Sequence, residues 1–105
     1  MTLEEVKRDL QEIRYFYTCK SLFDKVADVE IYSRVADKAA LYNKAISFAP
    51  AHLFDIYVAV YVNGNTQGRY ARESGYSCGY IKNLNQYLKE YLLREIARKE
   101  EEKAQ

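Results

Sequence analysis

The fold is decided by residues 66–84, which read TQGRYARESGYSCGYIKNL. A small residue, Ala71, is followed four positions later by a glycine, Gly75. A small side chain lets two helices touch where they cross, and glycine takes up the positive φ of a tight turn at no steric cost. Ile81 and Leu84, three residues apart, would hold the second helix against the first. The spacing therefore predicts a helix-turn-helix.

A helix-turn-helix typically binds DNA, because its second helix can enter the major groove. The distribution of charge agrees with this use. The net charge of the whole chain is only +1, but residues 64–99 contain seven basic and three acidic residues. Residues 1–63 contain eight basic and nine acidic residues, and the tail from residue 100 onward is acidic. The positive excess lies on the segment that would face phosphate.

Composition describes an ordinary small globular protein. The 105 residues suffice for one domain, and 49% hydrophobic with 30% charged residues argues against disorder. Cys19 and Cys78 are far apart and form no C-x-x-C pair, so neither a zinc site nor a redox dithiol is indicated. No apolar run approaches the ~20 residues of a membrane span, and the start of the chain does not resemble a signal peptide. We expect a cytoplasmic protein without a cofactor.

The first half of the chain has almost no glycine or proline, which favours long helices. Thr2 followed by Glu5 forms a capping box. We predict two antiparallel helices, residues 2–26 and 30–48, with a weak break near Asp28; one long bent helix is the alternative. The apolar stripes behind this prediction recur every three or four residues: Leu3, Val6, Leu10, Ile13, Tyr17, Leu22, Phe23 and Val26, then Ile31, Val35, Ala39, Tyr42 and Ile46.

A third helix is predicted from Pro50 to Val62, because proline is tolerated in the first turn of a helix. Its β-branched and aromatic residues could also indicate a strand. The apolar residues do not alternate cleanly, however, and a helix-turn-helix needs a supporting helix beside it. We therefore favour a helix.

The remaining helices are marked by their caps. Asn63, Gly64 and Asn65 predict a turn, after which Thr66 caps a fourth helix and Ser77 caps a fifth. The fifth helix carries a core stripe and then becomes wholly polar. That stripe consists of Ile81, Leu84, Leu88 and Leu92.

These elements predict an all-α fold with an N-terminal helical hairpin followed by a three-helix helix-turn-helix unit. The hairpin, which serves packing and oligomerisation, occupies residues 1–48. The DNA-binding unit occupies residues 49–99, and residues 100–105 form a polar tail.

Residues 50–92 resemble region 4 of bacterial sigma factors and the small region-4-like regulators of bacteria and their phages. The matching features are the proline-led helix that ends in YVNG, the TQ that opens the next helix, and the later runs ARESGYS and YIKNL. The resemblance implies sequence-specific DNA binding. No segment resembles the promoter-melting region, so it implies a transcriptional regulator and not a complete sigma factor.

Several polar side chains are placed to contact DNA. At ~100° per residue, Lys82, Asn83 and Gln86 lie opposite the core stripe of the last helix. Asn and Gln can bind adenine bidentately, and Lys can reach guanine or phosphate. Hydroxyls at helix N-termini and arginines on the preceding helix can hold phosphates. The predicted DNA-binding residues are Thr66, Arg69, Arg72, Ser77, Lys82, Asn83 and Gln86.

Nearby side chains are interpreted without a binding role. Cys78 is taken as a small residue that fits the start of the last helix, and His52 as a residue on the surface or rim of the third helix. Tyrosines near the motif are interpreted as packing at the rim of the core. They are Tyr70, Tyr76, Tyr80 and Tyr87.

The expected partner is double-stranded DNA, with RNA polymerase as a second partner that the resemblance implies. We do not expect an enzyme, because no nucleophile–base pair, metal cluster or phosphate loop is visible. Two alternatives stay open, a phage packaging component of the small-terminase kind and a protein-interaction module that contacts RNA polymerase. A homodimer is expected because the first two helices carry much apolar surface, namely Leu3, Leu10, Ile13, Phe16, Leu22, Phe23 and Ile31.

Overall fold

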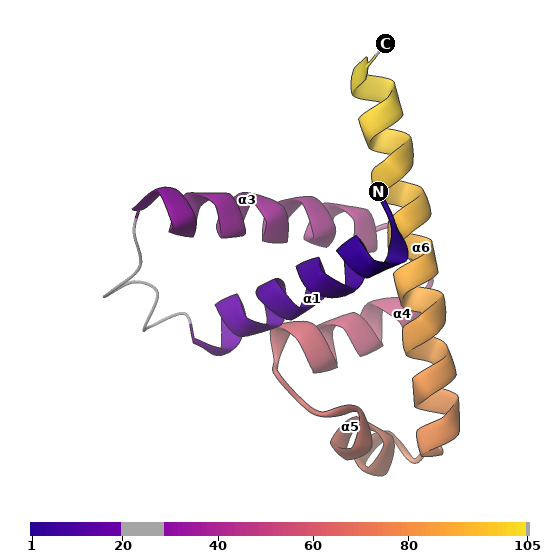
Figure 1. Cartoon of the computed structure of the whole chain (residues 1–105). Coiled ribbons are helices and arrows are strands. Elements are labelled where there is room, and N and C mark those ends of the chain that lie inside the picture. The colour runs from indigo at the N-terminus through magenta and orange to yellow at the C-terminus, as the bar shows by residue number, and fades with distance from the viewer. Residues whose placement is uncertain (20–28, 105) are drawn as a thin grey trace.

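Helices α1 (Leu3–Thr18) and α3 (Val29–Ile46) run antiparallel, side by side, in the computed structural model (Figure 1). The structure describes residues 1–19 and 29–104, with side chains only for 1–19, 30 and 32–99. Within these residues every regular element is a helix, so the all-α prediction is confirmed. None of the described helices combines the length and apolar character needed to cross a membrane.

α1 begins where the sequence predicts and ends earlier. Thr2 Oγ1 accepts a 3.2 Å hydrogen bond from the backbone nitrogen of Glu5, which confirms the predicted cap. The helix ends at Thr18, with Cys19 outside helical geometry at φ −113° and ψ 26°. The predicted end at residue 26 is therefore wrong, because an apolar stripe can continue past a helix end that no glycine or proline marks. The residues from 20 to 28, which include the predicted break, lie outside the described part of the chain.

Polar groups as well as apolar ones join α1 to α3. Asp9, which is buried, accepts a 2.7 Å hydrogen bond from the hydroxyl of Tyr42. Lys38 Nζ lies 3.0 Å from Asp9 Oδ1 and 2.6 Å from Glu12 Oε2. Two carboxylates and a buried hydroxyl thus fix the register of the two helices around one ammonium group.

The predicted third helix is confirmed as helical, but it has two parts. α4 (Ala51–Ile56) follows Pro50 directly and continues into the π-helix η1 (Tyr57–Val62). The wider turns place Tyr57, Val60 and Tyr61 in the core. Hydrogen bonds across five and six residues mark its end, from Asn63 N to Val58 O at 2.8 Å and from Asn65 N to Ala59 O at 3.0 Å.

Arg14 of α1 holds the end of η1 in place. Its Nε donates to the carbonyl of Val60 at 3.3 Å, and its Nη2 donates to the carbonyl of Gly64 at 3.0 Å. These are backbone acceptors at a helix end, which a helix does not satisfy by itself. The guanidinium therefore links α1 to the segment that leads into α5 (Gln67–Ser74).

α6 (Cys78–Ala104) is the longest helix and packs against α1, α3, α4 and α5 (Figure 1). The predicted stripe is confirmed, and Ile96 extends it by one turn. Side chains from all the helices form one hydrophobic cluster with this stripe. The polar tail continues the helix as far as Ala104. α6 is thus the helix that the other helices share as a packing partner.

Candidate nucleic-acid interface

The turn between α5 and α6 has the features that the sequence predicts. Thr66 Oγ1 accepts from the backbone nitrogen of Arg69 at 3.1 Å, and Ser77 Oγ accepts from that of Tyr80 at 3.1 Å. Ala71 is 2% exposed, so a larger side chain would not fit between the two helices. Gly75 closes α5 with φ at 82°, in the left-handed region that favours glycine. Both caps, the small contact residue and the turn glycine are confirmed.

α6 is anchored on its inner side by a contact that sequence reasoning missed. Asn85 is buried, and its Oδ1 accepts a 2.6 Å hydrogen bond from the hydroxyl of Tyr61 in η1. Burial is the main cause that raises the pKa of Tyr61, while the bond to Asn85 and the charge of Arg14 lower it. An asparagine between Leu84 and Leu88 in the apolar stripe was the signal that could have revealed this contact.

The outer side of α6 carries the predicted base-reading residues. Lys82, Asn83 and Gln86 are exposed, which confirms that they face away from the core. They border a shallow groove of about 520 Å³ between α6 and the start of α5. The groove also brings together residues that were not predicted. Its lining consists of Gln67, Gly68, Cys78, Lys82, Asn83, Asn85, Gln86 and Lys89.

Gln67 and Lys89 are the chemically useful additions to this set. Gln67, the first residue of α5, lines the groove, and Lys89 follows Lys82 after two helical turns. The seven-residue spacing of the two lysines was visible in the sequence. The position of Gln67 was not, because it depends on the angle between the helices.

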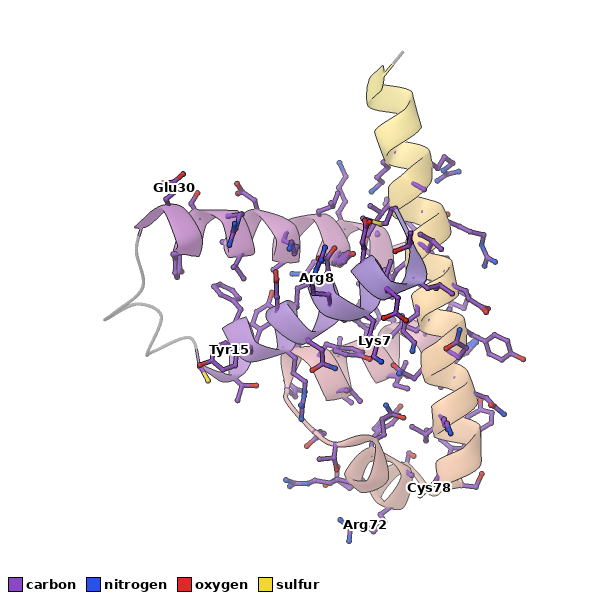
Figure 2. The ribbon with its side chains drawn as sticks, in the orientation of Figure 1. Lys7, Arg8, Tyr15, Glu30, Arg72 and Cys78 are labelled. Carbon is purple, nitrogen blue, oxygen red and sulfur yellow. The ribbon has the colours of Figure 1, made fainter. Side chains whose placement is uncertain are left out.

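The two predicted phosphate-binding arginines differ from each other. Arg69 Nε lies 2.9 Å from Glu73 Oε1, and both side chains are more than half exposed. Arg72 is exposed in the last turn of α5 and points away from the body of the protein (Figure 2). Neither arginine lines the groove. Thr66 and Ser77 lie at helix starts, as predicted, but they are also outside the groove lining.

The tyrosines near the turn are more open to solvent than rim packing suggests. The exposed fractions of Tyr76, Tyr80 and Tyr87 are 51%, 44% and 61%. The rings of Tyr76 and Tyr80 lie 4.7 Å apart at an interplanar angle of 37°. Tyr70 is half-buried, and burial, followed by the charge of Asp55, raises its pKa.

Other reactive side chains do not gather into a site. Cys78 and His52 are both exposed, His52 on α4 as expected and Cys78 at the first position of α6 (Figure 2). Within the described residues no three His, Cys, Asp or Glu side chains are grouped as metal ligands would be.

Comparisons of the chain with protein-family models, with curated proteins and with solved structures found no match.

Proposed function

We propose that the protein binds double-stranded DNA in a sequence-specific manner, with the first turns of α6 in the major groove. The observation that carries this proposal is the exposed row Lys82, Asn83 and Gln86 on the side of α6 opposite the buried stripe. The resemblance to sigma region 4 supports a transcriptional regulator of bacterial or phage type. α5, the turn and α6 would act as the helix-turn-helix.

The chemistry of the row suits the edges of base pairs. The amide groups of Asn83 and Gln86 can each donate to and accept from adenine. Gln86 Nε2 is only weakly engaged, at 3.4 Å from Glu90 Oε1 on the same exposed surface. Little intramolecular bonding is lost when it turns toward a base.

Backbone contacts would come from the helix starts and from α5. Thr66 and Ser77 use an oxygen lone pair in capping, which leaves each hydroxyl hydrogen free to donate to a phosphate. Arg72 is already directed outward. Arg69 would have to leave Glu73, which costs little because exposed ion pairs contribute only ~0.2–1 kcal/mol.

The helices α1 and α3 would support α5 and α6 and would form the dimer interface. Leu10, Ile13 and Phe16, which belong to the apolar surface predicted to be shared between the helix-turn-helix and a second copy, are buried within one chain, whereas Leu3 is 36% exposed. A symmetric dimer would present two copies of α6 to half-sites about one helical turn apart. The homodimer is thus part of the proposal, with less apolar surface available on α1 than the sequence suggests.

Selection from random duplexes tests the proposal directly. The purified chain is mixed with randomised double-stranded DNA, and the bound fraction is sequenced over several rounds. The affinity for the most enriched sequence is then measured from low to high salt. We expect a recurrent site whose log affinity falls linearly with log salt concentration.

Retention of no duplex at low salt would refute DNA binding. It would favour a protein-interaction module. DNA binding by a ring of eight or more subunits would instead favour a packaging component.

A further inference from the structure

The tyrosine hydroxyls of the chain differ in their partners. Four of them donate to an acceptor inside the fold: Tyr42 donates to Asp9, Tyr57 to Asn43, Tyr61 to Asn85 and Tyr91 to the Ala45 carbonyl. The exposed Tyr80 and Tyr87 have no hydrogen-bond partner for their hydroxyls among the described residues. Both hydroxyls are therefore available as hydrogen-bond donors on α6, the helix that we propose enters the major groove of DNA.

Their position on α6 mirrors that of the lysines. Tyr80 and Tyr87 are seven residues apart, as are Lys82 and Lys89. Each tyrosine precedes a lysine by two residues, which at ~100° per residue places them on opposite edges of the helix. Lys82 and Lys89 line the groove beside α5, whereas Tyr80 and Tyr87 do not. The exposed side of α6 therefore has a lysine edge and a tyrosine edge, with Asn83, Gln86 and Glu90 between them.

Between residues 78 and 94 the one carboxylate of α6 is that of Glu90, which lies between the two edges, 3.4 Å from Gln86 Nε2. Arg94, seven residues after Tyr87, continues the tyrosine edge with a positive charge and is exposed. The ring of Tyr80 is also supported by that of Tyr76 at 4.7 Å. The tyrosine edge thus presents two neutral hydroxyls and one positive charge toward a phosphate.

We propose that the two edges of α6 hold the two strands of the duplex. Lys82 and Lys89 contact phosphates of one strand, and the hydroxyls of Tyr80 and Tyr87 donate hydrogen bonds to phosphates of the other. The dimensions agree, since a helix with its side chains is ~10–12 Å across and the major groove is ~12 Å wide. Tyrosine hydroxyls are among the groups that bind DNA phosphates. This inference rests on the proposed function and adds which residues position α6 between the strands.

Two variants separate the edges by their response to salt. Tyr87→Phe removes one neutral donor, so we expect affinity for every sequence to fall about three- to tenfold with an unchanged salt dependence. Lys89→Gln removes one charge, so the slope of log affinity against log salt should decrease by about one. Tyr15→Phe is the matched control, because Tyr15 is exposed at the far end of α1 (Figure 2). It should bind DNA like the unmodified protein.

Neutralised phosphates then assign each edge to a strand. The phosphates of the selected duplex are replaced one at a time by methylphosphonates, and fluorescence anisotropy gives the affinity of each duplex. We expect Tyr87→Phe to lose sensitivity to replacements on one strand and Lys89→Gln to those on the other.

If both variants lose sensitivity on the same strand, or if Tyr87→Phe binds like the unmodified protein, the two-edge arrangement is overturned while DNA binding stands. If no duplex binds, the proposed function and this inference fall together.

Discussion

The hydroxyl of Tyr61 donates a 2.6 Å hydrogen bond to Oδ1 of Asn85, and this bond joins α6 to η1. Both residues are buried. Arg14 of α1 in turn binds the end of η1 through two hydrogen bonds. Polar contacts thus link α1 to η1 and η1 to α6. The orientation of α6 therefore depends on residues far from it in sequence.

Tyr61→Phe should destabilise the protein by ~1–3 kcal/mol, because it leaves a buried asparagine oxygen without its donor. The free energy of unfolding from urea titration, followed by circular dichroism, measures the effect. Tyr76→Phe is the control, since the Tyr76 side chain is 51% exposed and should change stability little. Equal stability of the two variants would show that the Tyr61–Asn85 bond does not hold α6.

Alkaline pH should destabilise the fold through its buried tyrosines. Burial raises the pKa of both Tyr57 and Tyr61 above the ordinary value of 10.0. Between the ordinary and the raised pKa the unfolded chain has released these protons and the folded chain has not, so stability is complete below pH ~10 and falls as pH rises above it. Urea titrations at pH 8, 9.5 and 10.5 should show this fall.

The pKa of Lys38 is also raised, so its deprotonation should likewise lower the stability of the fold at alkaline pH. Substitution of the two tyrosines separates their contribution from that of other groups. Tyr57→Phe/Tyr61→Phe should be less stable at pH 8 and lose less stability on going to pH 10.5. An equally steep fall in the double variant would assign the pH dependence to other groups.

Two glycines, one within α5 and one at its end, should respond in opposite directions to alanine. Gly75 has φ at 82°, so Gly75→Ala is strained and should cost ~1 kcal/mol. Gly68 lies inside α5, and a Cβ there would meet nothing within 4 Å. Gly68→Ala should therefore stabilise the helix by ~0.5–1 kcal/mol. Thermal unfolding of both variants tests the turn, and a Gly75→Ala variant as stable as Gly68→Ala would contradict its geometry.

Light scattering tests the proposed dimer. We expect twice the 12.3 kDa chain mass at tens of micromolar protein. Leu3→Glu, which places a charge on apolar surface that is 36% exposed, should shift the equilibrium toward the monomer. A monomer for the unmodified protein at this concentration would remove the dimer, and with it the expectation of a palindromic site.

Local chemistry made the features of α5 and of the turn that follows it predictable. The caps at Thr66 and Ser77, the turn at Gly75 and the burial of Ala71 each follow from the size, hydrogen-bonding or φ preference of one residue type. The ion pair of Arg69 with Glu73 could also have been read from its i,i+4 spacing.

Features that depend on tertiary geometry were not predictable. η1 spans six residues of apolar sequence, too few for its wider turns to be distinguished in the sequence from those of an ordinary α-helix. The end of α1 at Thr18 has no glycine or proline signal. Gln67 and Lys89 join the groove only because α5 and α6 meet at a particular angle.

A comparison of Asn83→Ala with Arg72→Ala tests whether α6 lies in the major groove of DNA. Both residues are exposed, so both variants should stay folded. Affinities for the selected site and for a scrambled duplex are measured across salt concentrations.

We predict that Asn83→Ala costs ~1–3 kcal/mol on the selected site, relaxes the preference at one or two base pairs and leaves the scrambled duplex unaffected. Arg72→Ala should weaken both duplexes alike and reduce the salt slope by about one. Indistinguishable losses on both duplexes for the two variants would contradict the placement of α6 in the groove.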